Sequence, residues 1–147
     1  MQFEGTVSIK APREDVWEFL TDPEKVTQCV PGVESFEIVE PGKKFNAVAG
    51  LGLGTVKVKF KTEIEWLGLD KPNMARMHAK GTAPGSSMEA ISEMHLENTD
   101  GGTTELRWSA DIKIFGKIAS LAARLMGGVT NKLSAAFFQC VKRKIEG

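Results

Sequence analysis

The chain contains no tyrosine, two histidines and two cysteines, Cys29 and Cys140, among its 147 residues. The cysteines form no CxxC pair and have no histidine partner close in the sequence, so neither a disulfide framework nor a structural zinc site is expected. The scarcity of tyrosine and histidine leaves few side chains for general acid–base chemistry. We therefore expect no bound metal.

Net charge and long apolar runs are absent as well. Nineteen basic residues balance nineteen acidic ones, and a neutral chain lacks the basic field typical of nucleic-acid-binding domains. No run approaches the roughly 18 apolar residues of a membrane span, and the N-terminus has no signal-peptide pattern. Hydrophobic and charged fractions of 41% and 26% are ordinary. We expect one cytoplasmic domain spanning residues 1–147, with no nucleic-acid partner.

The N-terminal third predicts one strand and two short helices. Apolar and polar residues alternate over residues 3–9, which is typical of a half-buried strand. Pro12 suits the first turn of a helix, and Asp22 with Pro23 is typical of a helix N-terminus. The second helix is expected to end near Cys29.

Strand patterns dominate the middle of the chain. The clearest covers residues 56–66, where apolar residues alternate with lysine and glutamate. This pattern predicts an antiparallel sheet with one wet face. The remaining strands are expected at residues 35–39, 45–49, 76–80, 88–97 and 104–113.

The pattern changes to a helical period from about Gly116 and continues for about thirty residues. Lys142, Arg143 and Lys144 fall in the last turn, where cations complement the helix dipole or could contact anionic lipid. Gly127–Gly128 predicts either a kinked point over a cavity or a packing requirement. The element order predicts an α+β fold in which a curved sheet grips one long helix.

Ionisable residues of the long strands fall in the outward phase. Both histidines, His78 and His95, are outward, and so are Glu63, Glu65, Glu89, Glu93, Glu97, Glu105 and Asp111. The only polar residues in the inward phase are Thr62, Ser92 and Thr104. We therefore assign no catalytic residue.

The glycine-rich segment Gly50–Gly54 superficially resembles a phosphate-binding loop. Such a loop needs a helix after it, whereas here a strand follows. The segment is expected to be a hairpin or bulged connection. A second interpretation is a mobile lid with exposed Leu51 and Leu53.

Inward methionines and tryptophans could form a plain core or line an adaptable apolar site. Small inward residues, Ala47, Ala49, Ala79, Ala90 and Ala110, would leave volume unfilled beneath a straight helix. The candidate ligand-binding residues are inward-facing on the strands or on the apolar stripe of the helix. They are Val58, Phe60, Ile64, Trp66, Met77, Met88, Ala90, Ser92, Met94, Leu106, Trp108, Leu121, Leu125, Met126 and Val129.

Several segments resemble the CoxG family, the G subunits of carbon monoxide dehydrogenase, in order along the chain. They are residues 3–5, 11–17, 20–23, 29–34, 81–86, 102–106 and 116–121. The resemblance implies a START-like helix-grip fold of the SRPBCC superfamily, with about seven strands and an apolar cavity. It also implies an accessory role for a molybdenum-containing carbon monoxide dehydrogenase or related hydroxylase, either recruiting the enzyme to the membrane or carrying quinone.

Three functions follow as hypotheses. The first is a non-enzymatic carrier of an apolar small molecule, a respiratory quinone or other isoprenoid lipid, with peripheral contact at the inner face of the cell membrane and no covalent cofactor. The inward hydroxyls would orient a quinone carbonyl. The second is a cyclase or dehydratase, which would need inward acids, bases or tyrosines. The third is an assembly or membrane-recruitment module for the dehydrogenase with a solid core.

Overall fold

The alternating and helical patterns of apolar residues correspond to one antiparallel sheet, two short helices and one long helix in the computed structural model, which describes residues 1–147. The strands are β1 (Gln2–Ile9), β2 (Val33–Glu40), β3 (Lys44–Leu53), β4 (Val56–Asp70), β5 (Met74–Ala83), β6 (Ser86–Thr99) and β7 (Thr103–Gly116). The helices are α1 (Arg13–Thr21), α2 (Pro23–Val26) and α3 (Ala119–Glu146). The predicted α+β architecture is confirmed.

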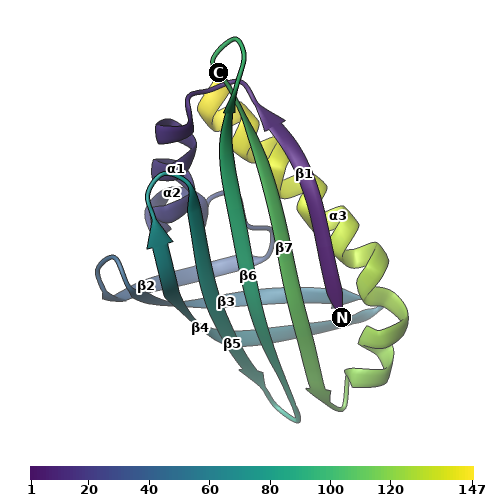
Figure 1. Ribbon diagram of the computed structural model, residues 1–147. Helices are drawn as coiled ribbons and strands as arrows, with labels where there is room; N and C mark the ends of the chain where they lie inside the picture. The colour runs from purple at the N-terminus through teal and green to yellow at the C-terminus, as the bar shows by residue number, and fades with distance from the viewer.

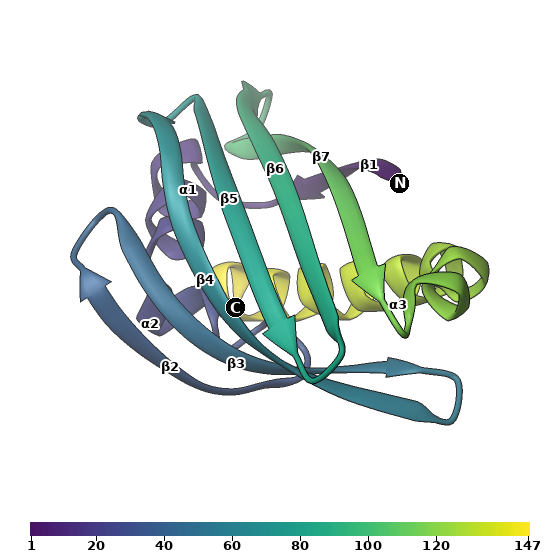
Figure 2. The ribbon, with the colours of Figure 1, turned by 90° about the horizontal axis from the view of Figure 1, so that it is seen from below.

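The sheet has the order β1-β7-β6-β5-β4-β3-β2, so β1 and β2 are its edges. It curves around α3, which runs along its inner side, and α1 and α2 lie at one end (Figures 1 and 2). The β1 edge runs beside α3, whereas β2 is the outermost strand on the other side. The three helices include no candidate for a membrane span.

Local signals account for most element ends. Asp22 accepts a hydrogen bond from the Glu24 amide at 2.9 Å, as expected of the N-cap of α2. Gly116 connects β7 to α3 with φ of +92°, and a Cβ there would lie 2.2 Å from the Gly85 carbonyl oxygen. Only glycine fits that position.

Two expectations about glycine-rich segments are wrong in part. Strand β3 continues through Gly50 to Leu53, because these residues pair in register with the strongly alternating start of β4. Leu53 is fully buried rather than exposed. Helix α3 is unbroken, and Gly127 and Gly128 are both exposed with open space where a Cβ would lie. Neither a cavity nor a packing contact explains them.

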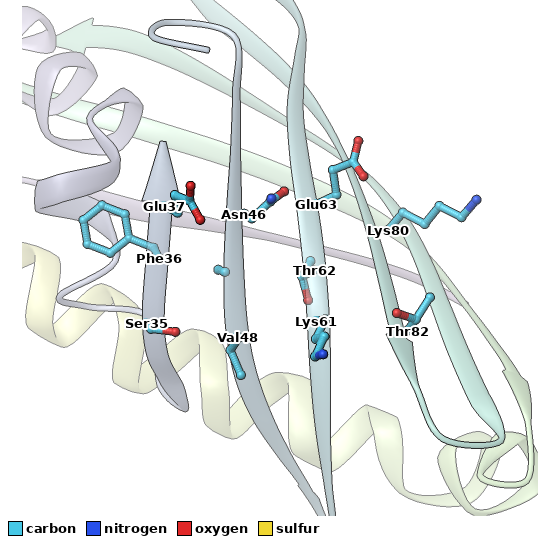
Figure 3. A pocket seen from close by; sticks show the side chains of 11 residues that line it. Ser35, Phe36, Glu37, Asn46, Val48, Lys61, Thr62, Glu63, Lys80 and Thr82 are labelled. Atoms are coloured by element: carbon cyan, nitrogen blue, oxygen red, sulfur yellow. The ribbon is translucent and has the colours of Figure 1, made fainter. Parts of the chain in front are cut away.

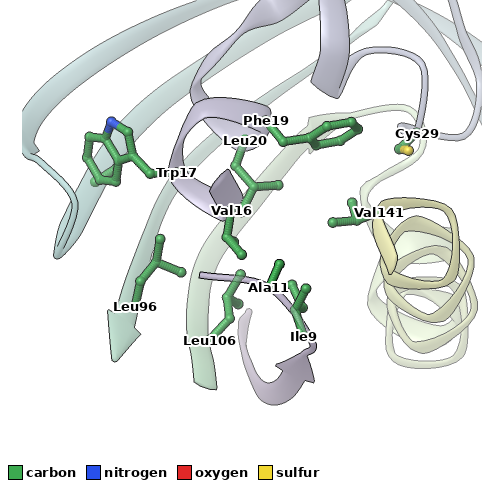
Figure 4. Close-up of a cluster of buried hydrophobic side chains, with 11 residues drawn as sticks. Ile9, Ala11, Val16, Trp17, Phe19, Leu20, Cys29, Leu96, Leu106 and Val141 are labelled. Carbon is green, nitrogen blue, oxygen red and sulfur yellow. The ribbon is translucent and has the colours of Figure 1, made fainter. Parts of the chain in front are cut away.

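Buried apolar residues form three separate clusters. The cap-end cluster joins α1 to the sheet and to the end of α3 (Figure 4); it comprises Ile9, Ala11, Val16, Trp17, Phe19, Leu20, Cys29, Ala75, Leu96, Leu106 and Val141. The hairpin-end cluster lies where the β3–β4 hairpin meets the start of α3; it comprises Leu53, Phe60, Ile118, Ala122 and Met126. The sheet cluster comprises Phe45, Ala47, Ile64 and Ala79.

The two cysteines contradict the expectation from composition that the chain has no disulfide. Cys29 and Cys140 form a disulfide, with their Cα atoms 5.4 Å apart. Their 111-residue separation carries no pairing signal in the sequence; only the fold brings the loop after α2 against the last turns of α3. The bond therefore ties the short helices to the long one.

Candidate apolar ligand site

Small residues line the middle of the inner sheet face. The register pairs Ala79 directly with Ala90, and Ser92 directly with Ala110. Ala47 lies two strands from this group and belongs, with Ala79, to the sheet cluster. Cross-strand neighbours stand about 5 Å apart. The small inward residues of β5, β6 and β7 therefore form a low floor, as their phase along the strands predicts, and Thr62 and Ile64 of β4 lie between this floor and Ala47.

No apolar side chain of α3 belongs to the sheet cluster or packs against it. Every member of the sheet cluster comes from a strand, and so do Met77 and Ala90, the partly buried residues packed against it. By contrast, residues of α3 belong to both of the other clusters. Met77 and Ala90 remain partly accessible to water. The buried apolar contacts of α3 are therefore with the two ends of the sheet and not with the sheet cluster.

The predicted site residues are distributed over the three clusters. Phe60 and Met126 are buried at the hairpin end, where Val58, Met88, Leu121, Leu125 and Val129 pack on them. Ile64, Met77 and Ala90 belong to the middle. Trp66, Met94 and Trp108 pack against the cap-end cluster. Leu106, another predicted site residue, is 1% exposed and packs among residues of α1. It therefore belongs to the packed core at the cap end.

Two of the three inward hydroxyls are already engaged. Thr104 donates to the Ala11 carbonyl at 2.7 Å, and Ser92 donates to the Ser109 carbonyl at 3.1 Å. Hydroxyls that serve backbone carbonyls are less free to orient a ligand.

Thr130 is a functional candidate that the sequence analysis missed. Its Oγ1 atom is buried and has no hydrogen-bond partner. Helical spacing, four residues after Met126 and three before Leu133, places it on the side of α3 that faces the sheet. A threonine within an apolar helical stripe gives only a weak signal in sequence. Buried hydroxyls without partners are uncommon.

Charged groups lie on the outer face, as predicted. His78 and His95 are within 3.8 Å and 2.9 Å of the Glu89 and Glu93 carboxylates. A hydrogen bond from Lys44 lowers the pKa of Glu63, and the same bond raises the pKa of Lys44. These exposed pairs contribute little to stability.

One hollow also lies mainly on the outer face. It is solvent-open, has a volume of about 620 Å³, and is lined by eleven residues of β2 to β5 (Figure 3). Most of them are polar or charged, such as Glu37, Asn46, Lys61 and Lys80, and none is a predicted site residue. This hollow does not suit an apolar ligand.

A second hollow, of about 400 Å³, lies along the seam between β1 and α3. Trp108 and Phe138, whose ring centroids are 6.4 Å apart, provide its aromatic part, and polar residues such as Asn131 and Gln139 also line it. Trp108 is the only predicted site residue in it. The indole lies against Gly5, where a Cβ would come within 2.7 Å of Nε1. The hollow thus reaches the inner face at Trp108.

A curved seven-stranded sheet around a C-terminal helix defines the helix-grip fold of the START-like SRPBCC superfamily. A conserved protein from Geobacillus kaustophilus is similar, with TM-score 0.91, 25% identity and coverage of 99% of this chain and 95% of that one. The Zhui aromatase/cyclase from Streptomyces sp. R1128 has TM-score 0.75, 21% identity and coverage of 99% and 93%. Ara h 8.0201 has TM-score 0.67, 17% identity and coverage of 99% and 97%. The latter two show the fold alone.

Within this superfamily, the chain belongs to the CoxG family, the G subunits of carbon monoxide dehydrogenase, whose model matches residues 5–146. The expected resemblance is thereby confirmed over nearly the whole chain. No curated protein matches the sequence.

Proposed function

We propose that this protein is a non-enzymatic carrier of an apolar ligand, a respiratory quinone, and that it serves a molybdenum-containing carbon monoxide dehydrogenase or related hydroxylase. The ligand would lie between the inner sheet face and α3, bounded by the three clusters. Family membership supports the link to the dehydrogenase. Exchange of ligand with the cytoplasmic face of the membrane would be peripheral and gated by the β3–β4 hairpin or the short helices.

The observation that supports this proposal most directly is the sheet cluster, on which no apolar side chain of α3 packs. A solid core would bring residues of α3 onto Ala79 and Ala90, because protein interiors are close-packed. An apolar ligand would gain about 25 cal/mol for each Å² that it removes from water there. A quinone also carries carbonyl oxygens, and the Thr130 hydroxyl could donate to one of them.

The inner face offers little support for an enzyme of the cyclase kind. The residues of the sheet cluster and those packed against it are phenylalanine, alanine, isoleucine and methionine, whereas both histidines lie on the outer face. General acid–base catalysis needs a titratable group within hydrogen-bond reach of the substrate. The second candidate function is an assembly or membrane-recruitment module for the dehydrogenase, which the exposed apolar residues of β2 favour.

Replacing Ala90 with leucine tests whether the space is empty. The larger side chain would project from the floor toward α3. We expect the free energy of unfolding of the ligand-free protein to change by less than about 1 kcal/mol, while retention of added menaquinone falls. In a filled core the same change would overpack the interior and destabilise it by about 1–3 kcal/mol. Urea denaturation with and without menaquinone distinguishes the two results.

Replacing Thr130 with valine should move stability and binding in opposite directions. Removing a buried hydroxyl without a partner should raise the free energy of unfolding of the ligand-free protein by about 1 kcal/mol. Affinity for menaquinone should fall about fivefold, because one hydrogen bond is lost. Thr130→Ser, which keeps the hydroxyl, is the matched control. Equal menaquinone affinities in the valine and serine variants would remove Thr130 from the site.

A further inference from the structure

We infer that the free edge of β2 is a docking site for an extended segment of a partner protein, in which basic residues alternate with apolar ones. We call residues Val33–Glu40, on the side of β2 away from β3, the β2 edge. The inference concerns a protein partner and holds whether or not the inner face carries a quinone.

The β2 edge is open along its whole length. Seven of its eight residues are exposed, and only Val33 is of intermediate exposure. In the sheet order nothing follows β2, and the ribbon shows no helix along its outer side (Figure 2). The outward backbone amides and carbonyls of an edge strand are ready to pair with another strand.

Apolar side chains on this edge are exposed to an unusual degree. Phe36 is 38% exposed, Ile38 39% and Val39 51%. Edge strands that avoid association usually carry lysine or proline. This strand has neither, although its pairing with β3 shifts at both ends. Three large apolar residues on one open edge indicate a surface that a partner covers.

The charges of the β2 edge determine which partner fits. The strand carries Glu34, Glu37 and Glu40 and no basic residue. Glu34 pairs with Lys59 at 3.1 Å, while Glu37 and Glu40 form no ion pair. A second copy pairing edge to edge would bring three glutamates from each chain together, and like charges across a strand pair are destabilising. A strand with lysine or arginine between apolar residues is complementary.

Such a partner would lie next to the proposed ligand site. Phe36 pairs in register with Ala47, and Ile38 pairs with Phe45. Ala47 and Phe45 both belong to the sheet cluster. Because side chains at the same register position share one face of a sheet, the apolar residues of an added strand would extend the floor of small residues outward.

The test uses a seven-residue probe peptide, Val-Lys-Val-Lys-Phe-Lys-Thr, which alternates as the inference requires. We expect the peptide to shift the amide NMR resonances of residues 33–40, with binding that weakens as salt is added. Glu37→Lys should weaken binding about fivefold, because one attractive cross-strand pair becomes repulsive. Glu37→Gln should give an intermediate loss. A peptide with glutamate in place of lysine should gain affinity for the Glu37→Lys variant.

The matched control is Glu97→Lys, an exposed substitution on β6, which should leave peptide affinity unchanged. Shifts confined to other strands, no binding at all, or equal losses in the Glu37→Lys and Glu97→Lys variants would overturn the inference. So would concentration-dependent dimerisation of the unsubstituted protein that Glu37→Lys alters, seen by analytical ultracentrifugation, because it would assign the edge to a second copy.

Discussion

Reduction of the disulfide between Cys29 and Cys140 should lower the free energy of unfolding by about 4 kcal/mol. The bond closes a loop across a sequence separation of 111 residues, and closure of a long loop removes much of the entropy of the unfolded chain. The loss is a large fraction of the roughly 5–15 kcal/mol that stabilises a typical domain. Urea denaturation with and without dithiothreitol measures it.

The double variant Cys29→Ser/Cys140→Ser separates the disulfide from other effects of the reductant. It should be at least as unstable as the reduced protein and insensitive to dithiothreitol. Identical urea midpoints for the unsubstituted protein with and without dithiothreitol would show that the two cysteines are not joined. Cys29 is 4% exposed in the cap-end cluster, so the serine variant also replaces a buried apolar group.

Replacing Met94 with lysine should abolish retention of menaquinone, with a loss of affinity of about 100-fold or more. Met94 pairs with Trp108 in register and packs against the cap-end cluster while remaining partly accessible. An ammonium group placed beside an apolar ligand would be costly to desolvate. Retention is measured by gel filtration of the protein with added menaquinone, followed by extraction.

The controls for Met94→Lys test whether the variant folds and whether the ligand binds the inner rather than the outer face of the sheet. His78→Ala changes the outer face of the neighbouring strand and should leave retention unchanged. If the lysine variant fails to fold, Met94→Gln, which is polar but uncharged, replaces it in the test and should also retain less menaquinone than the unsubstituted protein. Loss of menaquinone from a folded His78→Ala variant would mean that the ligand binds the outer face.

The spacing of apolar residues and the residues typical of turns made the fold predictable. The alternation of residues 56–66 placed lysines and glutamates on one face, and the helical stripe after Gly116 identified the only element long enough to cross the sheet. Strand β3 was predicted too short because glycines weaken a strand pattern. Its pairing with β4 restores the strand, and this long-range effect has no signature within the segment.

The candidate site was less predictable, since it depends on register and on contacts between distant elements. The alternation along β6 and β7 predicted that Ala90 and Ala110 face inward. Only the register between strands shows that Ala90 adjoins Ala79 and that Ala110 adjoins Ser92. The sequence suggested that the Thr104 hydroxyl was available to a ligand, yet it donates a hydrogen bond to the Ala11 carbonyl at the cap end. The Cys29–Cys140 bond likewise depends on the tertiary fold.

Organic extraction of freshly purified protein, followed by mass spectrometry, tests the central claim most directly. The account predicts a respiratory quinone at close to one molecule per chain, or the same occupancy after incubation with menaquinone when the purified protein is empty. An empty extract both before and after incubation, from protein with an intact disulfide and native circular dichroism, would contradict it. The chain would then be better described as an interaction module of the CoxG family.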